Sequence, residues 1–148
     1  MKTIIFILII LSFIQTAILP LNLVLIILIA RALVRTDKSN LFLAFGFGLL
    51  ISHLSLEPIG IKSLIYLVLI QLTQLLSKSR FSASQFLIIP VVAVFSSINL
   101  ITAVLLNHQS VQLLPEILIE SFIALPIFFL VRVWEERFVV RKGIKLRV

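Results

Sequence analysis

Residues 21–60 read LNLVLIILIARALVRTDKSNLFLAFGFGLLISHLSLEPIG, two apolar runs on either side of a short basic and polar segment. The segment between the runs, from Arg31 to Lys38, is too charged to lie in hydrocarbon, whereas the runs themselves suit helices in lipid. The Glu57-Pro58-Ile59-Gly60 turn ends the second run. This stretch therefore predicts a helical hairpin in a membrane.

The composition of the whole chain supports this prediction. Of 148 residues, 61% are hydrophobic and 13% are charged. A soluble domain of this size would need more polar surface to face water, so lipid is the expected solvent. Cysteine is absent, which excludes disulfides and thiolate metal ligands.

Apolar runs recur along the chain and predict an all-α, polytopic transmembrane helical bundle. The expected spans are about 4–19, 21–34, 41–56, 61–77, 86–106 and 113–133. Because residues 21–34 give only ~21 Å of helix, one helix over 4–34 kinked at Pro20 is an alternative, with five spans. Residues 1–133 are expected to form the transmembrane domain, and residues 134–148 a basic cytoplasmic tail.

Lys2 and the apolar run after it also look like a signal peptide. Because no small-residue cleavage site follows, we expect the segment to be retained.

The basic residues predict the orientation of the bundle. If both termini are cytoplasmic, Lys62 alone among the 13 Lys and Arg residues lies on the outer side, which is the positive-inside pattern. The basic residues would then meet anionic lipid of the inner leaflet. They are spread singly among apolar runs, so no nucleic-acid partner is expected.

Several short motifs follow one another along nearly the whole chain. They are Gln15-Thr16, Pro20 with Asn22-Leu23, the basic segment from Arg31 to Lys38, Ala44-Phe45 with Gly48, Ile59-Gly60, and Leu125-Pro126-Ile127-Phe128-Phe129-Leu130 with Arg132. In this order the chain resembles the rod shape-determining protein MreD family, small integral membrane proteins of the bacterial cell-wall elongation machinery. Asn22 and Ser52 stand where that family commonly has Asp.

The resemblance implies a non-catalytic scaffold in the bacterial inner (cytoplasmic) membrane. Its expected partners are an MreC-like membrane protein and other rod-complex proteins, which would couple the MreB filament to peptidoglycan synthesis. The sequence has no G-x-S-x-G, phosphate loop or H-E-x-x-H motif, so we expect neither an enzyme nor a cofactor or metal site. The alternative is the substrate-binding S component of an energy-coupling-factor vitamin transporter, another small six-helix protein. Short outer loops favour the scaffold.

Ala44, Gly48 and Ser52 lie four residues apart on one face of the third expected helix. Small residues at this spacing let a second helix approach closely in lipid. We expect packing against the second or fourth helix, and docking of a partner helix is the alternative. Gly60, in the following turn, is grouped with them as a packing or contact position.

Polar side chains in the apolar runs are the remaining candidates for a site. They are His53, Lys62, Tyr66, Gln71, Gln74, Asn99 and Glu120. Glu120 is expected to pair with Lys62. The face that carries Gln71 and Gln74 is expected to turn toward other helices or a wet cavity rather than lipid. His53 lies either at membrane depth, as a site, or near the outer headgroups. These groups either line a cavity, as a transporter needs, or join helices, which we favour.

Overall fold

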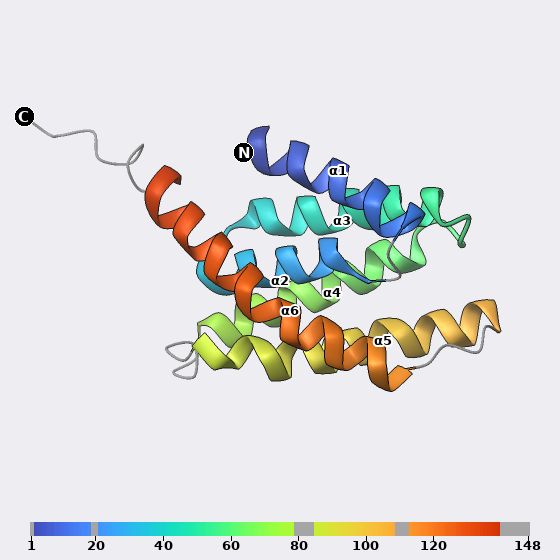
Figure 1. The fold of residues 1–148 in the computed structure, drawn as a ribbon. Helices are drawn as coiled ribbons and strands as arrows, with labels where there is room; N and C mark the ends of the chain where they lie inside the picture. The colour runs from blue at the N-terminus through green and yellow to red at the C-terminus, as the bar shows by residue number, and fades with distance from the viewer. Residues whose placement is uncertain (1, 19–20, 79–84, 109–112, 140–148) are drawn as a thin grey trace, which may run out of the picture.

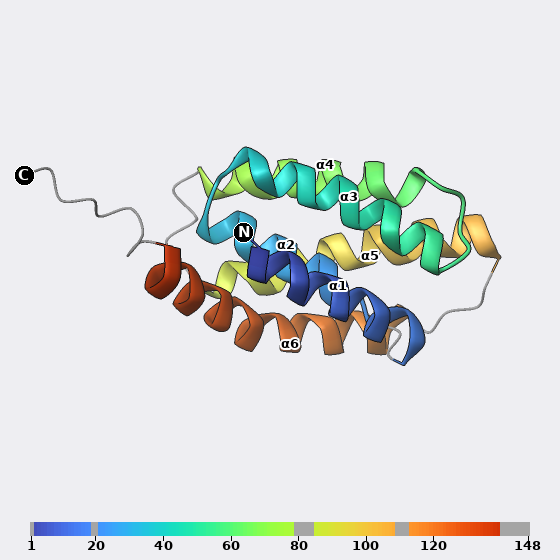
Figure 2. The same cartoon turned by 90° about the horizontal axis from the view of Figure 1, so that it is seen from above.

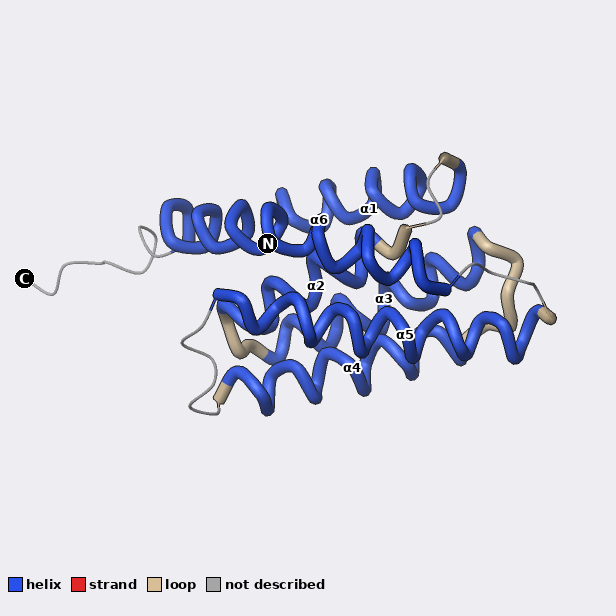
Figure 3. The backbone as a smooth tube through the Cα atoms, turned by 60° about the horizontal axis from the view of Figure 1, so that its bottom comes forward, coloured by secondary structure: helices blue, strands red, loops and turns tan. Residues whose placement is uncertain are grey.

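The computed structural model of the chain describes residues 2–18, 21–78, 85–108 and 113–139. These residues form helices and no strand (Figure 3). The α-helices are α1 (Lys2–Ala17), α2 (Leu23–Val34), α3 (Lys38–Leu54), α4 (Ile61–Ser77), α5 (Ile88–Asn107) and α6 (Leu113–Trp134). A 3-10 turn, η2 (Gln85–Leu87), precedes α5, and a π-helical turn, η3 (Glu135–Val139), follows α6. The prediction of an all-α fold is confirmed.

The helices occupy the six predicted ranges and run in alternating directions (Figure 1). The first of them ends at Ala17, the second begins at Leu23, and the two pack against each other. A single kinked helix over 4–34 is therefore wrong. The reversal is possible because N–H groups at the start of α2 find acceptors on other helices, as described below.

The central element of the bundle is α2, which contacts each of the other five α-helices. The α3–α4 hairpin lies on one side of α2 and the α5–α6 hairpin on the other, while α1 crosses α2 and α3 (Figures 1 and 2). Eight of the 12 residues of α2 are buried, from Val24 to Ala32. α2 is buried because the other five α-helices surround it.

The outer surface of the bundle is apolar. Large hydrophobic side chains are exposed on α1, α3, α4, α5 and α6, among them Phe13, Phe42, Leu72, Ile98 and Phe122. Within the described residues, two segments are long and apolar enough to cross a membrane, Ile88–Leu106 and Leu114–Arg137. The other four α-helices are apolar but have only 12 to 17 residues. Such a surface is compatible with a membrane protein.

Basic residues of the described part gather at the ends of the helices. Lys2 begins α1, Arg31 lies in the last turn of α2, and Lys38 begins α3. Since neighbouring helices alternate in direction, these ends lie together, with the end of α4 and the end of α6 (Figure 1). Lys62 lies at the opposite end, in the first turn of α4.

Candidate functional site

The most deeply buried charged group among the described residues is Glu120 of α6, whose side chain has no exposed surface. Its Oε1 atom accepts hydrogen bonds from the backbone N–H of Asn22 at 2.8 Å and from the side-chain amide of Asn22 at 3.1 Å. Its Oε2 atom accepts a hydrogen bond from the hydroxyl of Ser96 on α5. One carboxylate thus joins the start of α2 to α5 and α6.

Gln15 of α1 complements Glu120 at the start of α2. Its Oε1 atom accepts a hydrogen bond from the backbone N–H of Val24 at 3.1 Å. The first N–H groups of a helix have no partner inside that helix, and Asn22 makes no side-chain cap of its own. Gln15 and Glu120 therefore cap α2 from two different helices. The negative charge of Glu120 also suits the positive end of the helix dipole.

Tyr66 of α4 completes this buried polar cluster, which we call the α2 cap cluster: Gln15, Asn22, Tyr66, Ser96 and Glu120. The Tyr66 side chain is fully buried and lies near Gln15 and Glu120. No described residue meets its hydroxyl in hydrogen-bond geometry. The cluster therefore brings together two of the predicted polar residues, Tyr66 and Glu120.

Lys62 is not part of this cluster. Its Nζ atom lies 2.8 Å from Oε2 of Glu57, and both side chains are mostly buried. The predicted Lys62–Glu120 pair is therefore wrong. The turn between α3 and α4 brings Glu57 to Lys62 locally, whereas the oxygens of Glu120 are already occupied by donors on α2 and α5.

A double-mutant cycle distinguishes the two pairings. We expect Lys62→Gln and Glu57→Gln to couple by about 1 kcal/mol, because the ion pair is largely shielded from solvent. Lys62→Gln and Glu120→Gln are expected to be additive. The free energy of unfolding of the purified chain measures both cycles. Coupling between 62 and 120 that exceeds coupling between 57 and 62 would contradict this arrangement.

The small-residue face of α3 packs inside the molecule. Ala44, Gly48 and Ser52 are buried, and a Cβ atom built on Gly48 would lie 2.4 Å from Cα of Ser63 on α4. The expected packing against the fourth helix is therefore observed. α4 covers this face at Gly48.

Gly60 has a different role from the small residues of α3. Its φ angle of +102° lies in the region that favours glycine, and it forms the N-cap of α4. The space where its Cβ would stand is open. Gly60 therefore sets the turn between α3 and α4 and makes no close packing contact.

The remaining predicted polar residues do not converge. His53 and Gln71 are exposed, so Gln71 does not pack against the other described helices. Gln74, half-buried on the next turn of α4, donates a hydrogen bond from Nε2 to the backbone oxygen of Asp37 at 2.8 Å. Asn99 is buried on α5 and lines a small hollow with Glu57 and Lys62. Gln71 and Gln74 differ in burial because only one side of α4 meets α2 and α3, and Gln71 lies away from that side.

Compared with known proteins, the chain matches no family model, no curated protein and no solved structure. Its chemistry must therefore be judged from its own residues. Among the described residues, no three His, Asp or Glu side chains lie together in a way that could hold a metal ion. The α2 cap cluster offers one buried carboxylate, already bonded to three donors, and one phenol.

A second buried ionic contact was not predicted from the sequence. Arg31 near the end of α2 is 3% exposed, and its Nε atom lies 3.1 Å from Oε1 of the buried Glu135 in η3. Arg35 lies 3.6 Å from the other oxygen of Glu135. The packed part of the chain thus extends beyond 133, into the segment predicted as a tail. The signal in the sequence was an acidic pair, Glu135 and Glu136, inside a basic segment.

Asp37 caps α3 at the same end, and its titration predicts a pH dependence. The hydrogen bond from the backbone N–H of Ser39, with the nearby charge of Arg35, lowers the pKa of Asp37. The pKa of aspartate in the unfolded state is about 4. Because the pKa of Asp37 is lower in the folded state, its ionised carboxylate stabilises the fold at pH values above about 4. This stabilisation is lost as the pH falls through the lowered pKa. We expect Asp37→Asn to lower the melting temperature at neutral pH and to have no effect in stronger acid, measured by thermal unfolding.

Proposed function

We propose that the chain is a non-catalytic integral membrane scaffold of the kind that the MreD resemblance implies, which works with an MreC-like membrane protein and other rod-complex proteins. The observation that carries this proposal is that the polar residues of the bundle join its helices and loops to one another. Gln15 and Glu120 cap α2, Lys62 pairs with Glu57, and Gln74 bonds to the loop before α3. Each joins one part of the bundle to another, as a scaffold requires.

The polarity of the bundle supports a membrane location. Polar side chains such as Ser96, Asn99 and Glu120 are buried, whereas large apolar side chains such as Phe42 and Phe122 are exposed. This distribution suits lipid, because a hydrocarbon solvent favours apolar surface and leaves buried polar groups to bond with one another. The short α2 fits the same picture, since the protein around it takes the place of lipid.

The charged ends of the bundle support an orientation with both termini in the cytoplasm. The end that carries Lys2, Arg35 and Lys38 would lie at the anionic inner leaflet, and the end that carries Lys62 would lie outside. Single cysteines in this cysteine-free chain test the orientation. We expect an impermeant maleimide to label His108→Cys in intact cells and to leave Lys2→Cys, Asp37→Cys and Lys145→Cys unlabelled. Labelling at position 2 would contradict it.

The transporter alternative needs its polar residues around one ligand. Tyr66 and Glu120 lie in the α2 cap cluster, Lys62 and Asn99 lie at the hollow beside Glu57, and His53 is exposed. The hollow has a volume of only about 10 Å³, which is too small for a vitamin. The separation of these residues therefore favours the scaffold.

Copurification tests the proposed function. The tagged full chain, extracted from membranes in mild detergent, is expected to retain coexpressed MreC and not a transporter ATPase module. His53→Gln should leave this association intact, because the side chain is exposed and joins no described cluster. Retention of the ATPase module, or loss of MreC with His53→Gln at an unchanged protein level, would overturn the scaffold proposal.

A further inference from the structure

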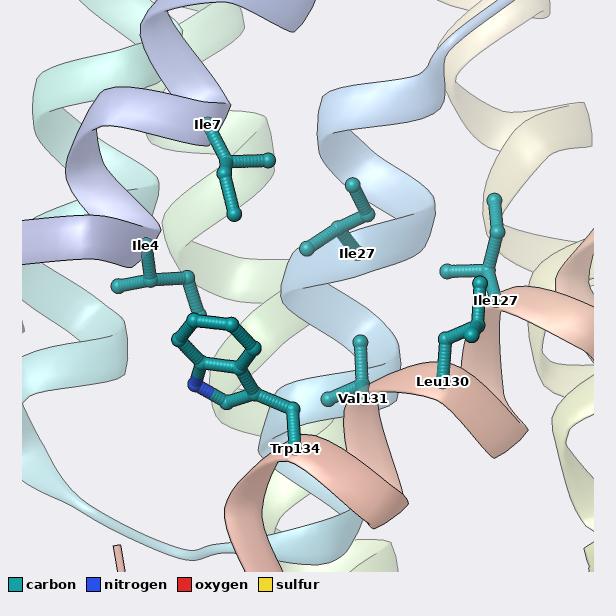
Figure 4. A pocket seen from close by; sticks show the side chains of 7 residues that line it. All are labelled: Ile4, Ile7, Ile27, Ile127, Leu130, Val131 and Trp134. Carbon is teal, nitrogen blue, oxygen red and sulfur yellow. The ribbon is translucent and has the colours of Figure 1, made fainter. Parts of the chain in front are cut away.

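An apolar groove lies between α1 and α6. It has a volume of about 220 Å³ and is lined by Ile4, Ile7, Ile27, Ile127, Leu130, Val131 and Trp134 (Figure 4). Ile27 of α2 forms its floor, and Trp134 of α6 reaches toward Ile4 of α1 at one end (Figure 4). Leu130 is 66% exposed and Ile7 is 37% exposed, so the groove opens sideways, away from the centre of the bundle.

The size and lining of the groove suit a hydrocarbon chain. Every residue that lines it is apolar or aromatic. An apolar cavity of about 150 Å³ is large enough to hold benzene, so this groove can hold a longer piece of hydrocarbon. The groove follows α6 from Ile127 to Trp134, a length of ~10 Å. This is about two thirds of the hydrocarbon thickness of one leaflet. A transmembrane helix, ~10 Å wide, would not fit in it.

The charges at one end of the groove suit an anionic headgroup. Lys2 is exposed two residues before Ile4, and Arg137 is exposed three residues after Trp134. The acidic groups of this region already have partners, because Glu135 pairs with Arg31 and Glu136 with Arg132. Lys2 and Arg137 therefore leave net positive charge where the groove ends. Tryptophan also prefers the boundary between hydrocarbon and headgroups.

We propose that the groove between α1 and α6 binds one acyl chain of an anionic phospholipid, whose phosphate lies beside Lys2 and Arg137. This inference rests on the membrane location in the proposed function. The lipid would fill the space between α1 and α6 above Ile27 and would hold the start of α1 against the end of α6. A protein partner at this site is a separate outcome of the test below.

The single tryptophan of the chain is a direct probe of this groove, because Trp134 lines it. The full chain is reconstituted in phosphatidylcholine vesicles that contain increasing mole fractions of either brominated phosphatidylglycerol or brominated phosphatidylcholine, which quench tryptophan on contact. We expect half-maximal quenching at a mole fraction about fivefold or more lower for the phosphatidylglycerol, from the attraction of each basic residue.

Two matched pairs of variants separate the groove from general attraction of anionic lipid to a basic protein. Lys2→Gln should lower the preference for phosphatidylglycerol about fivefold, whereas Lys78→Gln, an exposed lysine at the same end on α4, should not. Leu130→Phe should reduce quenching by filling the groove. Leu118→Phe, which changes an exposed leucine on the same helix outside the groove, should leave it unchanged.

The outcomes that overturn this proposal differ from those that overturn the proposed function. Equal quenching by the two brominated lipids, or equal effects of Lys2→Gln and Lys78→Gln, would refute a specific lipid site and leave the membrane location intact. Quenching by neither lipid would refute the membrane location as well. If both brominated lipids quench Trp134 and this quenching disappears when MreC is added, a protein occupies the groove and the lipid proposal is refuted.

Discussion

Replacing Gly48 by alanine is expected to destabilise the bundle by about 3 kcal/mol, the upper end of the cost of inserting one methyl group into a packed core. The new Cβ atom would lie 2.4 Å from Cα of Ser63, well inside van der Waals contact. The atom that it meets belongs to the backbone, so no rotation of a side chain relieves the clash. α3 and α4 would have to move apart along their contact.

Gly46→Ala, two residues earlier in α3, is the matched control for Gly48→Ala. Nothing lies within 4 Å of the position that its Cβ would take. Alanine is also the better helix former by about 1 kcal/mol, so this variant should be neutral or slightly more stable. Free energies of unfolding of the purified variants measure the difference. If the two variants were equally stable, the close contact between α3 and α4 would be disproved.

Glu120→Ala is expected to cost about 3 kcal/mol or more, because three buried donors lose their acceptor at once. They are the backbone N–H of Asn22, its side-chain amide and the hydroxyl of Ser96. Glu120→Gln should be milder, since the amide keeps one acceptor oxygen. Its NH2 group cannot accept a hydrogen bond, so the donor that faces it loses an acceptor.

Glu116→Ala controls for the loss of a carboxylate from α6. Glu116 lies one turn earlier on the same helix and is only partly buried. We expect it to change the free energy of unfolding by less than about 1 kcal/mol. Hydrogen exchange at the first turn of α2 provides a second measurement, because it should speed up in Glu120→Ala alone. Equal effects of the two substitutions would mean that Glu120 does not cap α2.

The helices could be predicted from the sequence because their signals are local. Apolar runs and the breaks between them placed the ends of all six within three residues of those observed. The close contact at Gly48 was also predictable, since small residues four apart mark a face where helices approach. The second and fourth helices both remained possible neighbours from the sequence. In the structure, the turn at Gly60 folds α4 back on α3.

The partners of the charged residues could not be predicted in the same way. Glu120 and Asn22 are 98 residues apart, and Arg31 and Glu135 are 104 residues apart. A sequence pattern gives the side of a helix on which a residue lies, but not which other helix faces it. Arg31 was grouped with the basic segment that follows the second expected helix, although it lies in the last turn of α2. Gln15 was noted only as part of a motif, although a buried helix start nearby needed an acceptor.

The capping of α2 by residues of α1 and α6 has a consequence for the order of assembly. A ribosome completes α2 long before it makes Glu120, so the second helix of the chain is finished without one of its two caps. During that interval Gln15 is the one described side chain available to cap the start of α2, and the donors of Asn22 find their acceptor only when α6 has been made. The central helix of this protein is therefore among the first to be synthesised and among the last to become stable.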